Sequence, residues 1–301
     1  MQQMEALKKA LDREKVPYLC NEPMSLHTTF KIGGPAGVFI RPGSEAQAAA
    51  ALRCCRGTGT PYFVLGRGSN LLVGDEGPKA AILQIGEGMS DVSLGGDTIL
   101  EAQCGIPLTR LCRFAQEQSL TGLEFAYGIP GYLGGGLYMN AGAYGGELRD
   151  VVRRVRWLDE DGILREASGE ELGFGYRRSY FTGRDCCILS ARLALEKGDP
   201  SAIGACMEEL MNRRREKQPL EYGSAGSTFK RPEGAYASAL IDQCGLKGLR
   251  VGDAQVSEKH AGFVINRGSA TCAQVQELIR RVQAVVKEKT GFELECEIRE
   301  L

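Results

Sequence analysis

Apolar residues at helical spacing predict two amphipathic helices at opposite ends of the chain. The first covers residues 2–14, with Met4, Leu7 and Leu11 on one face. The second covers residues 271–290, begins with a capping box of Thr271 and Gln274, and ends at Gly291. Its apolar face is expected to comprise Val275, Leu278, Ile279, Val282 and Val286. Both helices should therefore cover a core with one face only.

Apolar runs separated by turn residues predict the elements between these helices. A helix follows Ser44, which forms a capping box with Gln47, and Gly57 is expected to end it. A β-hairpin is expected to turn at Asp161–Gly162. Strands are expected within 61–65, 80–86, 97–104, 151–158, 163–168, 186–195 and 260–268, and further helices within 107–122, 200–217 and 238–245.

Residues 292–301 alternate between apolar and polar side chains, which predicts a final strand. Its apolar face comprises Phe292, Leu294, Cys296 and Ile298. The character of the sequence changes after Asp199–Pro200, so the main domain boundary is expected near residues 196–202.

The composition is that of a soluble globular protein and excludes several classes. The 301 residues are 43% hydrophobic and 25% charged, with a formal net charge of −1. That charge gives no general attraction to nucleic acid, and the run Arg213–Arg215 is expected to be mostly solvated. No apolar run resembles a signal peptide or a membrane span. We expect a cytoplasmic protein without nucleic-acid or membrane partners.

The cysteines predict neither disulfides nor a metal site. There are eleven cysteines and two histidines, and no CxxC spacing occurs. An odd number of cysteines without a secretory signal is typical of reduced, mostly buried thiols.

Two glycine-containing stretches carry the candidate chemistry. Residues 128–147 read GIPGYLGGGLYMNAGAYGGE, which is either a flexible linker or a segment whose bare backbone surrounds a large cofactor. The stretch VLGRGSN places Gly66 and Gly68 after a strand, but no third glycine and no helix follow, so it is not a Rossmann fingerprint. No GxxxxGK[ST] motif is present. The VLGRGSN turn could instead hold phosphate oxygens through backbone N–H groups, Ser69 and Asn70.

Motifs along nearly the whole chain resemble the UDP-N-acetylenolpyruvoylglucosamine reductase family. They are NEPMSLHTTFKIGGPA, LGRGSNLLV, the glycine-rich stretch, YRRSYF, GSAGSTFKRP, HAGFVIN and LECEIREL. The resemblance implies an α+β fold, in which a two-part FAD-binding domain of the vanillyl-alcohol-oxidase/PCMH type precedes a smaller α+β substrate-binding domain. The expected segments are 1–85 and 86–198 for the two FAD-binding parts and 199–301 for the substrate-binding domain.

The resemblance implies non-covalent FAD as the cofactor and NADPH as the electron donor. FAD contacts are implied for Gly66, Gly68, Ser69, Asn70, Gly128, Ile129, Pro130, Gly131, Asn140 and Gly142. A diphosphate beside the backbone favours glycine, because a side chain would displace the anion. Some flavin oxidases of this fold attach FAD through a histidine, but this family does not, so His27 is expected to be structural.

The implied reaction reduces the enolpyruvyl group of UDP-N-acetylglucosamine enolpyruvate to give UDP-N-acetylmuramate, in peptidoglycan synthesis. Such a site needs a cation at the substrate carboxylate and one positioned acid. Ser227 matches the family's proton donor, and Arg177 matches the arginine at the carboxylate. Glu297 matches a third catalytic residue of the family's ending. From residue types alone, Ser227 could be a turn serine and Glu297 a solvated glutamate.

Substrate contacts are implied for Tyr144, Lys217, Lys230 and His260. His260 could equally be a structural histidine beside apolar residues. Arg231 stands where many relatives have asparagine, and Cys296 where relatives often have proline. The chain also lacks the insertion after YRRSYF that closes over the substrate with a tyrosine in some members, so it resembles the shorter branch.

Two other functions are compatible with part of these features. An FAD-dependent oxidase of a small alcohol or lactone would keep both glycine-containing stretches, since a scaffold alone does not set function. It would have no reason to keep Arg177, Ser227 and Glu297 together. A non-catalytic nucleotide-sugar binding protein would have no reason to keep these three residues either.

Overall fold

The structure, a computed structural model, describes residues 2–301 and forms two compact units. Unit 1 comprises the residues up to Asn21 together with Gly37–Arg67 and Lys79–Arg213. Unit 2 comprises Glu22–Ala36, Gly68–Pro78 and Arg214–Leu301. The division into 1–85, 86–198 and 199–301 stays a prediction, and the contacts instead group two N-terminal segments with the C-terminal residues.

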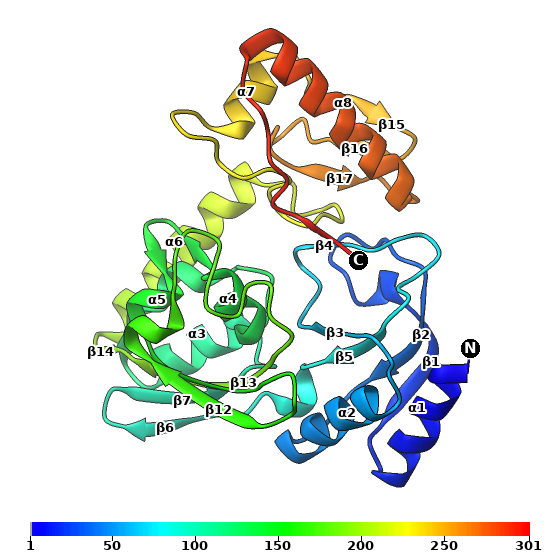
Figure 1. The fold of residues 1–301 in the computed structure, drawn as a ribbon. Coiled ribbons are helices and arrows are strands. Elements are labelled where there is room, and N and C mark those ends of the chain that lie inside the picture. The colour runs from blue at the N-terminus through cyan, green and yellow to red at the C-terminus, as the bar shows by residue number, and fades with distance from the viewer. Residues whose placement is uncertain (1) are drawn as a thin grey trace. The chain divides into compact units, whose positions relative to one another are not determined.

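The first part of unit 1 is a four-stranded sheet with two helices (Figure 1). The strand order is β1-β2-β5-β3, and β5 pairs in parallel with both β2 and β3. Helices α1 and α2 contact each other, and buried Leu7, Leu11 and Leu52 belong to the same core cluster. The elements are α1 (Gln2–Arg13), β1 (Tyr18–Pro23), β2 (Pro35–Ile40), α2 (Glu45–Gly57), β3 (Tyr62–Leu65) and β5 (Ala81–Gln84).

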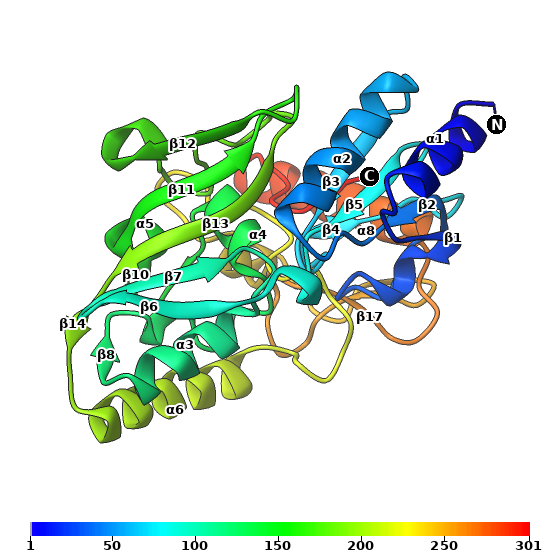
Figure 2. The same cartoon turned by 90° about the horizontal axis from the view of Figure 1, so that it is seen from below.

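The second part of unit 1 is a five-stranded antiparallel sheet of order β12-β11-β13-β7-β6. Helices α3, α4 and α5 lie against one face of it (Figures 1 and 2). Strands β8 and β14 form a separate short pair. The elements are β6 (Val92–Gly96), β7 (Ile99–Gln103), α3 (Leu108–Glu117), β8 (Leu120–Thr121), α4 (Leu133–Met139), β9 (Gly142–Ala143), β10 (Gly146–Glu147), α5 (Leu148–Val151), β11 (Val152–Leu158), β12 (Leu164–Ser168), β13 (Cys187–Ala194), β14 (Glu196–Lys197) and α6 (Pro200–Lys217).

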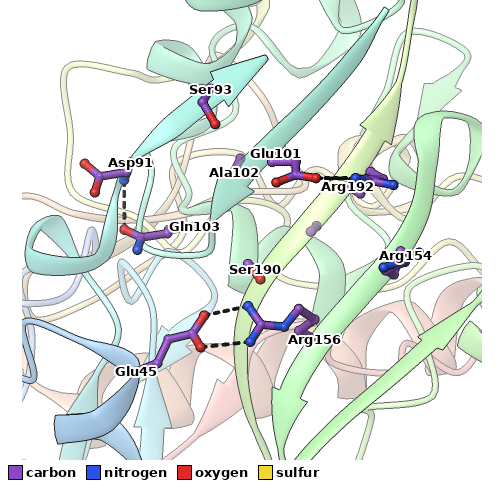
Figure 3. Close-up of a pocket in the computed structure, with 11 residues that line it drawn as sticks. Glu45, Asp91, Ser93, Glu101, Ala102, Gln103, Arg154, Arg156, Ser190 and Arg192 are labelled. Atoms are coloured by element: carbon purple, nitrogen blue, oxygen red, sulfur yellow. Dashed lines mark hydrogen bonds and ion pairs between the residues drawn. The ribbon is translucent and has the colours of Figure 1, made fainter. Parts of the chain in front are cut away.

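The other face of this sheet is polar and carries a shallow pocket of about 290 Å³ (Figure 3). Its arginines are paired with carboxylates. Arg156 donates to both oxygens of Glu45 at 2.9 and 3.0 Å, and Arg192 pairs with Glu101. Because these charges neutralise one another, the pocket offers no concentrated charge to a ligand.

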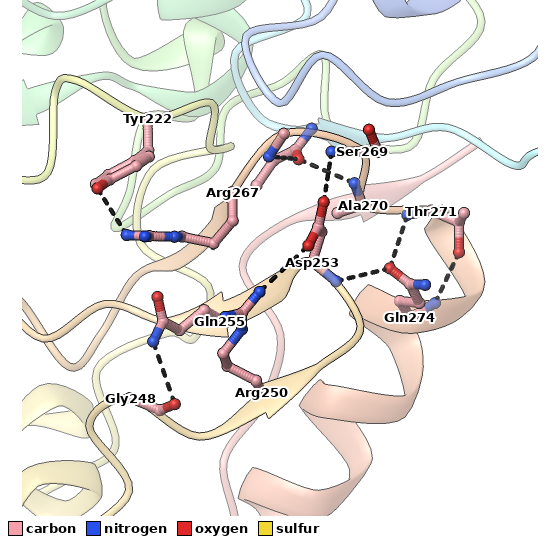
Figure 4. Close-up of polar contacts among 12 residues, drawn as sticks. Tyr222, Gly248, Arg250, Asp253, Gln255, Arg267, Ser269, Ala270, Thr271 and Gln274 are labelled. Atoms are coloured by element: carbon pink, nitrogen blue, oxygen red, sulfur yellow. Dashed lines mark hydrogen bonds and ion pairs between the residues drawn. The ribbon is translucent and has the colours of Figure 1, made fainter.

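Unit 2 contains the three-stranded sheet β15-β16-β17 and the parallel pair β18-β4. Helix α8 contacts β15, β16 and α7. A polar network around Asp253 holds the loops beside the sheet (Figure 4): its carboxylate accepts from Ser269 N at 2.9 Å and pairs with Arg250 at 3.2 Å. The elements are β4 (Leu71–Leu72), α7 (Ala237–Gln243), β15 (Arg250–Val251), β16 (Ala254–Val256), β17 (Val264–Asn266), α8 (Cys272–Thr290) and β18 (Arg299–Glu300).

The expected helix ends are confirmed for α8 and only partly for α2. Thr271 and Gln274 form the reciprocal capping box, and Gly291 takes a φ of 79° after the last turn. In α2, Ser44 accepts from Gln47 N at 3.2 Å. Helix α2 ends at Gly57, as expected, and Gly59 has a positive φ of 64°. The Gln47 side chain accepts from Gly43 N at 2.8 Å, one residue before Ser44, so the capping box differs from the expected one.

In two further places the structure differs from what the sequence predicts. The glycine-rich stretch contains the helix α4, whose Leu133 and Leu137 are fully buried. The final strand is regular only at Arg299–Glu300, although Leu294 and Ile298 are buried as the alternation predicts. The run Arg213–Arg215 is mostly exposed, as expected, and its middle residue Arg214 is 8% exposed, because neighbouring helical residues point in different directions.

The cysteines are free, and seven of the eleven are buried. Burial raises the pKa of Cys55 and Cys186 to about 12, so these thiols stay protonated at neutral pH. Within residues 2–301, no cluster of three or more His, Cys, Asp or Glu side chains could hold a metal ion. Over the same residues, none of the helices combines the length and apolar character needed to cross a bilayer.

Candidate active site

Several glycines of the 128–147 stretch are required by packing within the protein. A Cβ on Gly146 would lie 2.7 Å from the Phe125 ring, and one on Gly142 would lie 2.8 Å from Glu147 Cβ. Gly128 and Gly145 take positive φ values of 89° and 93°. The stretch is therefore an ordered helix and hairpin whose glycines permit close backbone contacts, and not a flexible linker.

Gly66 and Gly135 differ from these glycines because neither packing nor backbone conformation requires them. Neither residue has a positive φ. A Cβ on Gly66 would lie 3.8 Å from Gly135 N, and a Cβ on Gly135 would meet no other atom within 4 Å. Glycine inside a helix such as α4 is destabilising relative to alanine. Two bare backbone segments, after β3 and in α4, thus border open space that added side chains would fill, which fits a flat cofactor.

The turn that follows Gly66 continues into unit 2. Gly68 has a φ of 64°, and a Cβ there would lie 2.1 Å from the His27 carbonyl oxygen, so the fold itself requires this glycine. Asn70 donates its side-chain N–H to the Glu297 carbonyl oxygen at 3.1 Å and accepts from Arg299 N at 3.0 Å. Ser69 is half-buried beside them. The turn expected at the cofactor is thus tied to the segment that carries Glu297.

Residues Gly128, Ile129, Pro130 and Gly131 form a compact loop before α4. Ile129 N donates to the Ala126 carbonyl oxygen at 3.1 Å, and Gly131 N donates to the Ile129 carbonyl oxygen at 2.9 Å. The loop keeps Pro130 exposed and the other three residues half-buried. It leads directly into the helix that contains Gly135.

Asn140 ends α4 in the left-handed conformation, with φ 45° and ψ 59°, and is only 1% exposed. Its Nδ2 donates to Glu147 Oε2 at 2.7 Å and to the Gly175 carbonyl oxygen at 3.1 Å. Its Oδ1 accepts from Arg149 N at 3.0 Å. The side chain expected at the cofactor therefore makes its hydrogen bonds within the protein.

Arg177 occupies a tight turn between Gly175 and Arg178. Gly175 N donates to the Arg178 carbonyl oxygen at 3.0 Å, and Arg178 N donates back at 3.2 Å. Arg177 has a φ of 54°, a position in such turns that favours glycine. Arg177 is half-buried with its guanidinium 5.4 Å from the Tyr176 ring centre, whereas Arg178 is exposed, as expected. Strain of this kind in a non-glycine residue is found often at functional sites.

The end of α4 also holds the segment that follows this turn. The Tyr138 carbonyl oxygen accepts from Ser179 Oγ at 2.9 Å and from Thr182 Oγ1 at 3.3 Å. The Tyr138 hydroxyl accepts from Gly183 N at 3.0 Å. The YRRSYF motif is thus fastened to the glycine-rich stretch by hydrogen bonds on both sides of Arg177.

Tyr144 lies at the tip of the β9–β10 hairpin. Gly142 pairs with Glu147 and Ala143 pairs with Gly146, which leaves Tyr144 and Gly145 as the two turn residues. Both have positive φ values, of 55° and 93°, as in a type I′ turn. Tyr144 is 43% exposed, so the hairpin presents its ring outward.

Ser227 and Glu297 are held in unit 2 on either side of Thr228. Thr228 N donates to the Gly262 carbonyl oxygen at 2.8 Å, and its carbonyl oxygen accepts from Glu297 N at 2.9 Å. Thr228 Oγ1 accepts from Val264 N at 3.0 Å, and the residue is 2% exposed. Ser227 itself is exposed. The structure therefore brings these two predicted residues onto neighbouring backbone segments.

Glu297 differs from the other glutamates of the ending. The side chains of Glu293 and Glu295 are 76% and 72% exposed, whereas Glu297 is half-buried. Glu293 pairs with Lys287, and Glu295 pairs with Lys230. Glu297 is thus not one of several equivalent solvated glutamates, which its residue type alone left open.

The residues expected at the substrate lie in different surroundings within unit 2. Lys217 is exposed at the end of α6, and Lys230 is half-buried and paired with Glu295. The Arg231 guanidinium lies 3.9 Å from the Tyr236 ring centre, which gives it a cation–π contact. His260 is half-buried, and burial lowers its pKa below the usual value. His260 Nδ1 accepts from Gly262 N at 3.2 Å.

His27 makes a structural contact, since its Nε2 lies 2.8 Å from Glu22 Oε1. Thr228 and Tyr138 are the residues that sequence reasoning missed. Neither carries a chemical signal in the sequence, because their roles are hydrogen bonds to distant backbone. Thr228 lies directly beside Ser227 within GSTFKRP, and this adjacency is the one available hint.

Two family models match this chain. Residues 36–168 match an FAD binding domain, and residues 218–301 match the C-terminal domain of UDP-N-acetylenolpyruvoylglucosamine reductase. The reductase of Syntrophomonas wolfei is 47% identical over 279 residues, which cover 93% of this chain and 93% of that protein. The reductase of Caldanaerobacter subterraneus is 47% identical over 98% of this chain and 97% of that protein.

The chain belongs to the UDP-N-acetylenolpyruvoylglucosamine reductase family. A crystal structure of the reductase from Thermus caldophilus aligns with a TM-score of 0.80 and 36% identity, over 95% of this chain and 98% of that chain. The expected α+β fold, with an FAD-binding domain and a reductase C-terminal domain, is therefore confirmed.

Proposed function

We propose that this chain reduces the enolpyruvyl group of UDP-N-acetylglucosamine enolpyruvate to UDP-N-acetylmuramate, with NADPH as the reductant, in cytoplasmic peptidoglycan synthesis. The observation that carries the proposal is the family match over nearly the full length, at 47% identity. The protein is accordingly an FAD-dependent oxidoreductase.

FAD fits the open space beside Gly66 and Gly135, where bare backbone would face the cofactor. The loop 128–131 and Ser69 are the further residues we assign to its binding. The chemistry that FAD would supply when bound there is hydride transfer between NADPH and the substrate double bond. The protein contributes orientation and electrostatics to this chemistry.

Arg177 is assigned to the substrate carboxylate. Hydride addition to the enolpyruvyl double bond places negative charge next to that carboxylate, and a guanidinium can form two parallel hydrogen bonds to it. The hydrogen-bonded turn fixes the backbone from which this half-buried side chain extends, which preorganises its position. The positive φ of Arg177 supports this assignment, because a purely structural turn would favour glycine there.

Ser227 is assigned as the proton donor and Glu297 as its partner in stabilising the developing charge. An exposed serine hydroxyl is a weak acid, so it requires a fixed position and polar neighbours. The hydrogen bonds of Thr228 supply the fixed position. Tyr144, Lys217, Lys230 and His260 are assigned to the UDP-sugar. The ion pair with Glu295 occupies Lys230, so substrate binding there would exchange one anion for another.

An FAD-dependent oxidase of a small alcohol or lactone is the less supported alternative. It accounts for the match of residues 36–168 but not for the match of residues 218–301. It also gives no role to Ser227 and Glu297.

Anaerobic stopped-flow absorbance of the flavin tests the proposal. The purified protein is reduced with NADPH and then mixed with UDP-N-acetylglucosamine enolpyruvate. We expect bleaching with NADPH and recovery of the oxidised spectrum that depends on the sugar nucleotide. Bleaching without that recovery would favour the oxidase. A protein that cannot be reconstituted with FAD would overturn both.

A further inference from the structure

We propose that Asn140 is a positioning residue, whose side-chain amide holds both the turn that presents Arg177 and the hairpin that presents Tyr144. The inference rests on the proposed function for the importance of Arg177. It differs from the cofactor contact implied by the family resemblance, because it assigns the Asn140 amide to the protein itself.

The hydrogen bonds of Asn140 join three segments of unit 1. Its Nδ2 donates one hydrogen to the Gly175 carbonyl oxygen at 3.1 Å, which belongs to the Arg177 turn. It donates the other to Glu147 at 2.7 Å, and Glu147 pairs with Gly142 across the Tyr144 hairpin. Its Oδ1 accepts from Arg149 N in α5. Both amide hydrogens are therefore used inside the protein.

Asparagine is the residue type that meets both requirements of this position. The backbone takes the left-handed conformation, which glycine, asparagine and aspartate adopt most readily. The side chain must donate two hydrogen bonds and accept one. Aspartate would place its carboxylate against the Gly175 carbonyl oxygen and the Glu147 carboxylate, which repel it. Glycine would keep the backbone conformation and lose every side-chain contact.

The Arg177 turn needs an external restraint of this kind. Its two internal hydrogen bonds, between Gly175 and Arg178, fix the turn but not its place in unit 1. The Tyr138 hydrogen bonds described above reach residues after the turn, from Ser179 to Gly183. The bond from Asn140 to Gly175 fastens the side before it. Removing it takes away the hydrogen bond that joins Gly175, at the start of a strained turn, to the end of α4.

The structural part of the inference is tested by hydrogen exchange on the protein without FAD. In Asn140→Gly, amides of residues 175–178 should exchange about tenfold faster or more, because the turn opens more often. The matched control is Gln103→Ala, which removes a side-chain amide that accepts from Asp91 N at 2.9 Å elsewhere in unit 1. Unchanged exchange in the turn of Asn140→Gly would overturn the inference.

The functional part is tested by a double-mutant cycle with Arg177→Ala. Asn140→Gly should slow the substrate-dependent reoxidation of the flavin by about 100-fold, the typical effect of a small misplacement, and leave reduction by NADPH unchanged. At saturating sugar nucleotide, the same change in the Arg177→Ala background should slow reoxidation by less than about threefold, because Tyr144 is assigned to substrate binding and the rate itself depends on Asn140 through Arg177. The inference would be overturned if the two substitutions slowed reoxidation by independent factors that multiply in the double variant. It would also be overturned if Asn140→Gly lowered FAD affinity without faster hydrogen exchange in the turn.

The cycle also separates this inference from the proposed function. If Arg177→Ala alone leaves reoxidation unchanged, the assignment of Arg177 fails. The exchange of residues 175–178 in Asn140→Gly would then still decide whether Asn140 holds the turn.

Discussion

The two regions that carry the assigned catalytic residues are held in different ways. In unit 1, Arg177 lies on a strained turn that a side-chain amide and the end of α4 fasten in place. In unit 2, Ser227 and Glu297 are fixed by backbone hydrogen bonds, in which Thr228 pairs with Gly262 on one side and with Glu297 on the other. Backbone pairing continues from Lys230 N to the Glu295 carbonyl oxygen at 2.8 Å.

This difference sets how each region should respond to substitution. A turn that depends on single side chains can lose its geometry through one substitution, with little change in global stability. The backbone hydrogen bonds that join Thr228 to Gly262 and to Glu297, here called the ladder, should persist through most side-chain changes. They should weaken mainly where a buried side chain adds a hydrogen bond to them.

The largest effect is expected for Ser227→Ala. Removing one positioned proton donor should slow substrate-dependent flavin reoxidation by about 100- to 10,000-fold and leave reduction by NADPH unchanged. The ladder should persist, because it uses backbone atoms of Thr228 and not the Ser227 hydroxyl. Ser224→Ala in the same loop is the control. Equal loss in both half-reactions would show that Ser227 supports the fold and is not the acid.

Arg177→Gly should separate activity from stability in the turn. Losing the guanidinium should slow reoxidation by about 100- to 1,000-fold, as removal of one stabilising donor typically does. Glycine relieves the positive φ of 54°, so the free energy of unfolding should rise by about 1 kcal/mol in thermal denaturation. Arg178→Ala, at the exposed neighbour, should change neither quantity. A less stable Arg177→Gly protein would show that the turn is not strained.

Gly135→Ala should weaken FAD binding without harming the apoprotein. The added methyl group meets no protein atom within 4 Å, so it enters the space assigned to the cofactor. FAD affinity, measured by fluorescence titration, should fall about tenfold or more, while the apoprotein gains up to about 1 kcal/mol from helix propensity. Gly146→Ala is the contrasting variant, since its methyl group meets the Phe125 ring and should destabilise the protein. Unchanged FAD affinity in Gly135→Ala would place the cofactor elsewhere.

Much of the fold follows from sequence periodicity. The apolar face of α8 and both of its ends can be predicted, because the apolar spacing, the capping box and Gly291 all indicate the same helix. The helix α4 could not be predicted from the sequence, because its three glycines disfavour a helix. Its stability comes from burial of Leu133 and Leu137. The length of the final strand is overestimated for a related reason. Alternation predicts which side chains are buried, as Leu294 and Ile298 confirm, but it does not predict backbone pairing.

The candidate site is predictable only through the family resemblance. A serine, an arginine and a glutamate carry no mark of catalysis in composition or spacing. The structure adds signals that the sequence lacks, such as the φ of Arg177 and the half-burial of Glu297 beside exposed Glu293 and Glu295. The roles of Asn140 and Thr228 depend on contacts with residues distant in the chain, which one sequence does not reveal.

Thr228→Val tests the ladder at the hydrogen bond that the buried Thr228 side chain makes to it. Valine has nearly the same shape but cannot accept the hydrogen bond from Val264 N, which stays buried. The free energy of unfolding should fall by about 1–3 kcal/mol, the usual cost of an unsatisfied buried group. Thr228→Ser keeps the hydroxyl and should lose less. If valine is tolerated, the Thr228 hydroxyl is not needed to hold Ser227 and Glu297.

The smallest effect is expected from His260, which supports the same ladder through Gly262. Burial, aided by the charge of Lys247, lowers the pKa of His260 in the folded state. Between that lowered pKa and the unfolded pKa near 6.5, the unfolded chain binds more protons. The contribution of His260 to stability is therefore complete above pH 6.5 and declines as the pH falls below it, at no more than about 1.4 kcal/mol per pH unit for one proton.

Denaturant unfolding at pH 7.5, 6.0 and 5.0 compares the protein with His260→Gln, which has no titrating ring. The loss of stability on acidification should be smaller in the variant, because carboxylates titrate in both proteins and only the wild type must also protonate His260. Protonation at Nδ1 removes the acceptor for Gly262 N, the residue that pairs with Thr228. Acidification should therefore weaken unit 2 first, and hydrogen exchange at Thr228 should rise in the same pH range. Equal pH profiles for the two proteins would mean that His260 titrates alike in the folded and unfolded chains, and that the ladder is independent of its charge.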